Sequence, residues 1–354
     1  MTPASHPSTS VGRANRTLLG TAQPLATSYD VALLDLDGVV YVGPDPIPGA
    51  ADALARARAA GMRLAFITNN ASRGPVAVAA HLVALGVPAV ADDVVTSSQA
   101  AAAVIVERCG VGATVLVTGS DALRAAVEQV GLRVVASSDD RPDAVVQGYS
   151  PDLAYADLAE TTLAVRSGAL WVATNADSTL PSRRGLLPGN GSLVAAVALA
   201  TGKRPVVAGK PELPLHAEGV TRTGAKNPLV VGDRLDTDIE GAFAADTDSL
   251  LVLTGVTHAA DLVNAPIKHR PTYLAQDLAG LLEPQPGVEW DGSVARCGGW
   301  AATASPSAPT EISVDGEGRA IAGLRAVLTA AWMLQAPEGS HVDASGALNQ
   351  LGFG

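Results

Sequence analysis

The sequence has little of three things: aromatic side chains, cysteine and charge. Aromatic residues make up 3% of the 354 residues and charged residues 17%, below the quarter that is usual for globular proteins. Hydrophobic residues reach 47%, so intrinsic disorder is excluded for most of the chain. Two cysteines, Cys109 and Cys297, cannot build a disulfide framework, and their surroundings do not resemble a metal site. A reducing, cytoplasmic setting is therefore expected.

Long apolar runs are absent as well. No window reaches about 18 uninterrupted apolar residues, so a helix that spans a membrane is not expected. The Ser/Thr-rich N-terminus has no continuous apolar core after a basic patch, and no signal peptide is evident. The net charge of −11 argues against a nucleic-acid partner. We expect neither a membrane nor a nucleic acid among the partners.

What the sequence does contain is an alternation of short apolar runs with Ala-rich segments, between Tyr29 and about Pro284. It begins with a strand over Val31–Leu36, a helix over Ala50–Ala60 and a strand over Arg63–Thr68. This βαβ rhythm predicts an α/β fold with a Rossmann-like parallel sheet that helices cover on both faces. Right-handed crossovers align the carboxyl ends of the strands along one edge, where such sheets bind ligands.

The two ends of the chain differ from this pattern. Residues 1–28 are rich in Ser, Thr, Pro and Ala, and a flexible tail is predicted there. Three of the four tryptophans lie after about Pro284, where two short β-like runs and a helix over Leu324–Leu334 are predicted. Residues 285–354 are expected to form a small appended domain of unknown role. The alternative is a tail that only packs on the core.

The strongest local signal is Leu34–Gly38 (Leu-Asp-Leu-Asp-Gly). Asp35 and Asp37 stand two residues apart at the end of an apolar strand, so alternation puts both on one face, and Gly38 permits a sharp turn. Such a pair can share a divalent cation, and one carboxylate can attack phosphorus as a nucleophile. The alternative is an ordinary Asp-Gly turn at a strand end.

Three further polar segments follow predicted strands. The hydroxyl and amide groups of Thr68–Asn70 can donate hydrogen bonds to phosphate oxygens. The alternative is a turn that caps the N-terminus of the next helix. Gly209–Pro211 contains Lys210, whose ammonium group is suited to bind a phosphate or a carboxylate. The alternative is a solvated surface lysine. Gly232–Ile239 crowds three aspartates after a buried strand, which is costly unless they are paired or metal-bound; they could also mark an acidic helix N-terminus.

Taken together, the four segments are far more specific than any one of them. In chain order they are DLDGVVY, ITNNAS, GKP and GDRLDTDI, and the segments ATNAD and PGNGSLV stand between the second and the third. This order resembles the haloacid-dehalogenase-like hydrolase superfamily. More narrowly it resembles the NagD-like, 4-nitrophenylphosphatase branch, which includes phosphoglycolate, glycerol-3-phosphate and pyridoxal-phosphate phosphatases. The resemblance covers roughly residues 29–284 and does not extend into the C-terminal residues.

The resemblance implies roles for individual carboxylates. Asp35 is expected to be the nucleophile that forms an aspartyl-phosphate, and Asp37 the general acid and later the base. Mg²⁺ is expected to be held by the Asp35 carboxylate, the main-chain carbonyl of Asp37 and Asp233. Asp238 is expected to support the metal waters and Lys210 without binding the ion itself.

The same resemblance implies that Thr68, Asn69 and Lys210 bind the transferring phosphoryl group. A phosphoryl dianion repels a carboxylate nucleophile, and Mg²⁺ together with Lys210 offsets that repulsion. An alkoxide leaves poorly, so an acid two residues after the nucleophile favours the hydrolysis of phosphate esters. The expected activity is therefore Mg²⁺-dependent hydrolysis of a small phosphomonoester.

The resemblance also divides the chain into domains. A hydrolase core split in sequence, residues 29–98 and 205–284, is expected to carry an inserted α/β cap, residues 99–204. In the family this cap closes over the core, excludes water and sets the substrate. Relatives often pair through the cap, so a homodimer is expected by analogy, although the sequence itself leaves the oligomeric state open.

Within the predicted cap, Asn175, Asp177 and Arg183 are candidates for contact with the leaving group. Arg183 and Arg184 could equally form a solvated loop. No large aromatic residue stands in this loop to stack on a ring, which favours a small polar leaving group. The expected substrate is glycerol 3-phosphate, with 2-phosphoglycolate, pyridoxal 5′-phosphate and a nucleotide monophosphate as alternatives.

The sequence favours two other interpretations less. Gly189–Val194 imitates a dinucleotide-binding fingerprint, but it lacks the third glycine and has no suitable strand before it. A binding or regulatory protein with a catalytically silent core and an active C-terminal domain is a minority alternative. The four intact segments argue against it.

Overall fold

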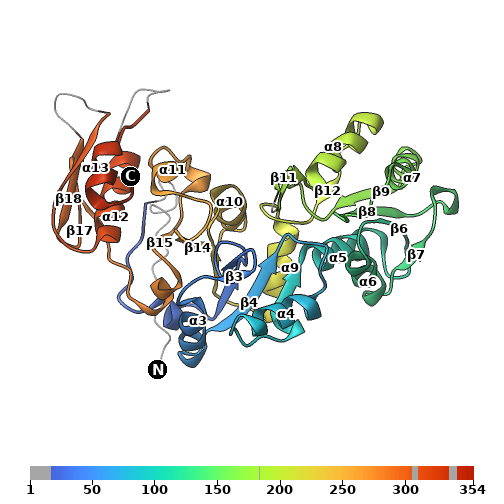
Figure 1. The fold of residues 1–354 in the computed structure, drawn as a ribbon, viewed down its shortest axis with the longest axis horizontal. Coiled ribbons are helices and arrows are strands. Elements are labelled where there is room, and N and C mark those ends of the chain that lie inside the picture. The colour runs from blue at the N-terminus through green and yellow to red at the C-terminus, as the bar shows by residue number, and fades with distance from the viewer. Residues whose placement is uncertain (1–16, 183, 305–309, 335–340) are drawn as a thin grey trace. The chain divides into compact units, whose positions relative to one another are not determined.

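The structure is a computed structural model that describes residues 17–182, 184–304, 310–334 and 341–354 (Figure 1). The chain forms two compact units. The first combines the two ends of the chain, up to Arg63 and from Asn227 onward, and the second is Leu64–Lys226. None of the helices in these described ranges is long and apolar enough to cross a membrane.

Parallel strands form the main sheet of the first unit. Going across the sheet, β15 pairs with β14, β14 with β13 and β13 with β1, all in parallel. Their apolar side chains are almost all buried, as expected for a parallel sheet covered on both faces. In chain order the strands are β1 (Val31–Leu34), β13 (Pro228–Gly232), β14 (Asp248–Val252) and β15 (Tyr273–Ala275).

Short helices connect and cover these strands. The longest is α3, whose apolar side chains recur on one face and are buried, while its arginines lie in the last turn where they favour the helix dipole. A hairpin of two short strands precedes it. These elements are α2 (Leu25–Ser28), β2 (Tyr41–Val42), β3 (Asp45–Pro46), α3 (Ala50–Ala59), a π-helical turn (Leu235–Ile239), α10 (Glu240–Ala244), α11 (Ala259–Val263) and the 3₁₀ turns Ile267–His269 and Leu278–Leu282. A further 3₁₀ turn, Ala91–Asp93, lies in the second unit.

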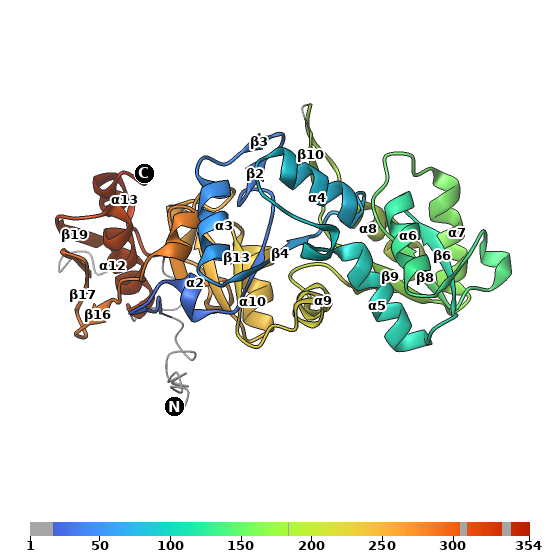
Figure 2. The same cartoon turned by 90° about the horizontal axis from the view of Figure 1, so that it is seen from below.

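The C-terminal residues add an antiparallel sheet and two helices to the first unit. The sheet runs β16-β17-β18-β19, and α12 packs against β17 and β18 (Figure 2). The elements are β16 (Glu289–Trp290), β17 (Val294–Cys297), β18 (Trp300–Ala304), β19 (Ile312–Gly316), α12 (Ala320–Met333) and α13 (Ser345–Leu351).

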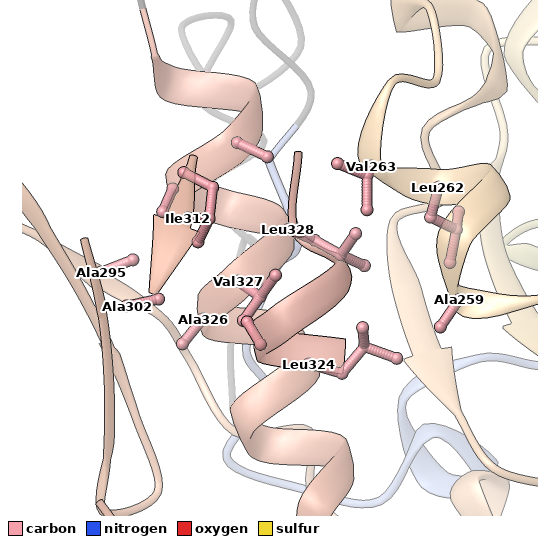
Figure 3. Close-up of a cluster of buried hydrophobic side chains, with 14 of the residues drawn as sticks. Ala259, Leu262, Val263, Ala295, Ala302, Ile312, Leu324, Ala326, Val327 and Leu328 are labelled. Atoms are coloured by element: carbon pink, nitrogen blue, oxygen red, sulfur yellow. The ribbon is translucent and has the colours of Figure 1, made fainter. Parts of the chain in front are cut away.

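Helix α12 lies between this sheet and the parallel sheet's own helix α11. Figure 3 shows Ala326 turned toward Ala295 and Ala302 of the antiparallel sheet, whereas Leu324 and Leu328 face α11. The helix is apolar almost all round, and eleven of its residues are buried, which is the pattern of a helix packed on two sides. The described C-terminal residues therefore share one hydrophobic core with the rest of the first unit.

A buried arginine ties the same segments together. Arg325 of α12 is fully buried, and its guanidinium donates to the carbonyl oxygens of Pro286, Leu274 and Leu19 and to Oε1 of Gln285. Burial lowers the pKa of this guanidinium. A buried cation is tolerated only when its donors are satisfied, and here the N-terminal segment, the parallel sheet and the C-terminal segment supply the acceptors.

The second unit contains a separate parallel sheet between two layers of helices. Its strand order is β12-β9-β8-β6-β7, with α5 and α6 on one face and α7 and α8 on the other (Figure 1). The strands are β6 (Thr114–Thr118), β7 (Arg133–Val135), β8 (Ala144–Gln147), β9 (Leu170–Ala173) and β12 (Val206–Val207).

Two more strand pairs and the helices complete the second unit. Strands β4 and β5 pair in parallel, and β10 and β11 form an antiparallel hairpin. Helix α5 begins with a capping box in which Thr96 and Gln99 bond to each other's main chain. The elements are β4 (Arg63–Thr68), α4 (Pro75–Ala84), β5 (Val94–Thr96), α5 (Ser97–Cys109), α6 (Asp121–Gln129), the 3₁₀ turn Ser138–Asp140, α7 (Tyr155–Arg166), β10 (Thr179–Ser182), β11 (Gly185–Pro188), α8 (Asn190–Thr201) and α9 (Leu213–Thr223).

The predicted α/β class with parallel sheets is confirmed, whereas the ends of the chain differ from the prediction. Residues 1–28 were expected to be a flexible tail. In the structure Leu18 and Leu25 are buried, and the Leu19 N–H donates to the carbonyl of Thr272 over 2.9 Å. The expectation is corrected for residues 17–28, because two leucines anchor this segment; residues 1–16 lie outside the described residues.

The C-terminal segment also contains more strand than the two runs predicted. Four strands form in its described residues. They are short, and β18 has alanine at three of its five positions, a residue that gives a weak strand signal. The predicted helix is present and begins four residues earlier, at Ala320.

Candidate active site

Two neighbouring strands of the first unit deliver its key carboxylates. Asp35 follows β1 directly, and its N–H continues the ladder by donating to the carbonyl of Val231 on β13 over 2.8 Å. Asp233 follows β13 directly. Because the two strands are parallel and in register, their carboxyl ends bring the two side chains together.

Asp238 joins these two carboxylates. One oxygen each of Asp35, Asp233 and Asp238 lies within 4.8 Å of the others. Asp233 is 0% exposed and Asp238 1%, so like charges are gathered where water screens them little. A set of buried carboxylates is the donor set that Mg²⁺ and Ca²⁺ prefer, and a divalent cation compensates their repulsion. The residues present therefore fit a hard divalent cation.

The chain around Asp233 is shaped to its carboxylate. The N–H of Val256 donates to Oδ2 over 2.7 Å, and the N–H of Thr257 donates to the main-chain carbonyl over 3.2 Å. A Cβ at Gly38 or at Gly255 would overlap the carboxylate. Gly38 also has a φ of 85°, so this position favours glycine on two grounds.

Asp238 is held by the turn that carries it. It lies in the π-helical turn Leu235–Ile239, and the N–H of Arg234 donates to its Oδ2 over 3.2 Å. A Cβ at Gly232 would overlap the Asp238 side chain. The arginine side chain itself turns outward to Asp236, where the ion pair lowers the pKa of Asp236. Asp236 therefore belongs to the surface of this turn.

Asp37 stands apart from the three clustered carboxylates. It starts the turn in which the Gly38 N–H donates to the Tyr41 carbonyl over 2.7 Å. Its carboxyl reaches solvent on one side, yet burial on the other side raises its pKa, and the N–H of Gly43 lowers it in part. A carboxyl with a raised pKa suits an acid that must hold its proton before transfer.

The predicted phosphate-binding residues lie in the second unit. Thr68 ends β4, is buried, and its hydroxyl accepts from the Asn70 N–H over 3.1 Å. The Lys210 N–H donates to Oδ1 of Asn69 over 2.8 Å. The structure thus brings Asn69 and Lys210 together, although 141 residues separate them in sequence.

Two of the predicted cap residues join the same cluster. Nδ2 of Asn175 donates to the main-chain carbonyl of Asn69 over 2.8 Å, and its Oδ1 accepts from the Asp177 N–H over 3.2 Å. Nδ2 of Asn69 lies 3.4 Å from both carboxylate oxygens of Asp177. Arg183 lies outside the described residues. Arg184 is exposed at the tip of the β10–β11 hairpin.

Asn190 is a residue of this cluster that the sequence analysis missed. It starts α8, is 1% exposed, and its Nδ2 donates to the carbonyl of Asn175 over 2.8 Å. A Cβ at Gly189 or Gly191 would overlap main-chain atoms of Ala176 and Asp177. The Gly-Asn-Gly run, which does not form a nucleotide fingerprint, therefore packs against the turn that carries Asn175. The two glycines on either side of Asn190 were the sequence feature that could have indicated this close packing.

Comparisons with known proteins show the family of this chain. Residues 32–133 match the family described as haloacid dehalogenase-like hydrolase, and residues 207–281 match one described as HAD-hydrolase-like. Asp35, Asp233 and Asp238 fall within these matches. The chain belongs to the haloacid dehalogenase-like hydrolases.

Within that family, the similar proteins are phosphatases. The chain is 48% identical over 323 residues to the D-glycerol 3-phosphate phosphatase of Mycobacterium tuberculosis, which covers 89% of both proteins. The crystal structure of the glycerol phosphate phosphatase from Mycobacterium tuberculosis in complex with magnesium matches with a TM-score of 0.83 and 45% identity, over 94% of this chain and all of that one. The p-nitrophenyl phosphatase from Archaeoglobus fulgidus matches with a TM-score of 0.67 and 27% identity, over 72% of this chain and 98% of that one.

Proposed function

We propose that the protein is a Mg²⁺-dependent phosphatase that hydrolyses glycerol 3-phosphate to glycerol and phosphate. The observation that carries the proposal is the cluster of Asp35 and Asp233, at the ends of parallel strands, with Asp238 of the following π-helical turn. The substrate is supported by the 48% identity to a D-glycerol 3-phosphate phosphatase over 89% of the chain.

Residues of the first unit would hold the metal. We assign the Asp35 and Asp233 carboxylates and the main-chain carbonyl of Asp37 as ligands. Asp238, which the sequence resemblance placed outside the coordination shell, has a carboxylate oxygen within 4.8 Å of oxygens of Asp35 and Asp233, and it would hold a water bound to the ion. The ion supplies positive charge next to the phosphoryl oxygens.

Asp35 would attack the phosphorus atom and form an aspartyl-phosphate, while the bond from phosphorus to the ester oxygen breaks. Asp37 would protonate the leaving alkoxide and then, as a carboxylate, take a proton from the water that hydrolyses the intermediate. The raised pKa of Asp37 supports the first of these steps. The glycines and the Val256 N–H around Asp233 fix its carboxylate, which would keep the ion in place beside Asp35.

The segment ends that carry Thr68, Asn69 and Lys210 would bind the phosphoryl group, and Lys210 would supply a positive charge. Asn175, Asp177 and Arg183 would meet the leaving group from a cap formed by residues 99–204. The predicted division into this cap and a core of residues 29–98 and 205–284 stays a prediction.

Assembly and location are further parts of the proposal. The enzyme acts on a small phosphate substrate, and we propose that it pairs through the cap and works in the cytoplasm. Support for pairing is the family resemblance alone. Support for the location is the pair of free cysteines, Cys109 and Cys297.

A panel of phosphomonoesters compared by kcat/KM tests the substrate. Glycerol 3-phosphate should exceed 2-phosphoglycolate, pyridoxal 5′-phosphate and a nucleoside monophosphate. A clear preference for pyridoxal 5′-phosphate or a nucleotide would contradict the small-polyol assignment. Removal of Mg²⁺ with a chelator should abolish turnover of every member, and a chain that hydrolyses none of them would favour the alternative of a silent core.

A further inference from the structure

Asn69 holds the main chain of Lys210 from both sides. The Lys210 N–H donates to Oδ1 of Asn69 over 2.8 Å, and Nδ2 of Asn69 donates to the Lys210 carbonyl oxygen over 3.1 Å. The second N–H of the same amide faces the carboxylate of Asp177 at 3.4 Å. A primary amide has two N–H donors, and both are directed at protein acceptors here.

Asn69 is itself fixed at its main chain. Its carbonyl oxygen accepts from Oγ of Ser97 over 2.7 Å and from Nδ2 of Asn175 over 2.8 Å. The carbonyl of Asn175 in turn accepts from the buried Asn190. Both the main-chain carbonyl and the side-chain amide of Asn69 are therefore bonded to protein groups, and such a network restricts the orientation of the amide.

The residue before Lys210 permits this close approach. A Cβ at Gly209 would lie 2.6 Å from both Oδ1 of Asn69 and the carbonyl oxygen of Thr174. Real Cβ atoms do not come so close, so any other residue would push Asn69 and Lys210 apart. The glycine of the Gly-Lys-Pro segment therefore serves the contact between these two residues.

We propose that Asn69 is a positioning residue for Lys210 and does not bind the phosphoryl group through its side chain. The inference rests on the proposed phosphatase function and changes the role that the sequence resemblance gave to Asn69. The amide sets the path of the main chain at Lys210, and this path sets where the ammonium group can reach. Asp177 and Asn175 hold the amide in place.

A double-mutant cycle tests this coupling. Asn69→Ala should lower kcat/KM for glycerol 3-phosphate by about 100-fold in the otherwise native enzyme, since small displacements of a phosphate-binding group are costly. In the Lys210→Ala background the same change should cost less than about 3-fold, because the group that Asn69 positions is gone. The affinity for inorganic phosphate in the presence of Mg²⁺, measured by calorimetry, should show the same non-additivity.

Asn264→Ala is the matched control. Like Asn69, Asn264 bonds through its side-chain amide to both the N–H and the carbonyl oxygen of one distant residue, Val342, over 2.9 Å each, and it lies outside the candidate site. It should change kcat/KM by less than about 3-fold. Asn69→Asp is the second variant if Asn69→Ala fails to fold: it keeps the shape and an acceptor for the Lys210 N–H but loses both donors, and it should show the same coupling to Lys210→Ala.

Three results overturn the inference. Losses that multiply in the double variant show that Asn69 acts independently of Lys210. An Asn69→Ala enzyme with native kcat/KM shows that no positioning is needed. A native protein that hydrolyses no phosphomonoester overturns the proposed function and this inference with it, whereas an active enzyme with multiplied losses overturns this inference alone.

Discussion

The N–H of Val256 lies 2.7 Å from Oδ2 of Asp233 and donates to it, so a loop after β14 fixes a carboxylate that follows β13. The preceding residue, Gly255, approaches the same carboxylate so closely that a side chain would overlap it. Gly38 does the same, and its carbonyl accepts from Oγ1 of Thr254 over 2.6 Å. Asp233 is thus enclosed by two glycines, and its orientation toward the other two aspartates depends on them.

Gly38→Ala should therefore remove metal binding. The added Cβ meets Asp233, and the carboxylate must move out of the cluster. In the native protein, Mg²⁺ at about 100 times its dissociation constant should stabilise the fold by about 2.7 kcal/mol, and this gain should disappear in Gly38→Ala. Melting temperatures with and without Mg²⁺ measure it.

Gly49→Ala is the control for backbone strain. Gly49 has a φ of 80°, close to the 85° of Gly38, but a Cβ added there would meet no atom within 4 Å. Gly49→Ala should cost about 1 kcal/mol through strain and keep the full Mg²⁺ shift. Equal Mg²⁺ shifts in the two variants would show that the close approach to Asp233 does not matter.

Asp35→Asn should abolish turnover. An amide keeps the shape of the side chain but is not a nucleophile, so kcat should fall on the order of 10⁴-fold or more. Asp236→Asn is a suitable control, since Asp236 pairs with Arg234 on the surface of the neighbouring turn. Steady-state kinetics at saturating Mg²⁺ check both. Near-native turnover in Asp35→Asn would exclude an aspartyl-phosphate at this residue.

The clustered aspartates of the first unit could be predicted from the sequence because two of them stand at the ends of predicted strands. Asp35 and Asp233 each follow an apolar run directly, and parallel strands bring such positions together. The glycine and main-chain contacts that orient Asp233 could not be predicted in this way. Gly255 and Val256 stand in a loop, and their meeting with Asp233 depends on the path of the chain in three dimensions.

The role of Asn69 shows a second limit. Its place in a Thr-Asn-Asn turn suggests a phosphate ligand, and only the contacts reveal that its amide faces the main chain of Lys210. The burial of Arg325 was not predicted for a related reason. The sequence around an arginine in an apolar helix does not indicate which distant carbonyl oxygens will accept its hydrogen bonds. Local pattern identifies the residue types, whereas long-range contacts decide what those residues do.

Arg325→Leu should destabilise the first unit. The change leaves the carbonyls of Leu274 and Pro286 buried without their donor, and a loss of about 3 kcal/mol is expected. Arg319→Gln, which removes an exposed ion pair with Glu283, should cost less than about 1 kcal/mol. Urea unfolding followed by circular dichroism compares them. A loss in Arg325→Leu no larger than in Arg319→Gln would show that the buried guanidinium does not hold these segments together.

Acid should destabilise the second unit through His216. Burial lowers the pKa of this histidine in α9, and its Nε2 is buried with no hydrogen-bond partner within the described part of the chain. The folded state therefore favours the neutral ring.

Above the pKa of about 6.5 of an unfolded histidine, neither state gains a proton and this group has no effect on stability. As the pH falls below that value, the unfolded chain binds a proton that the folded chain does not, so stability is lost until the folded pKa is reached, by about 1.4 kcal/mol for each unit between the two values. His216→Phe keeps a ring of similar size without a titrating group, so its urea midpoint should fall less than that of the native protein between about pH 7.5 and about pH 5. His258→Gln, at an exposed position, should leave the native loss unchanged. Equal losses in His216→Phe and the native protein would show that other groups cause the acid sensitivity.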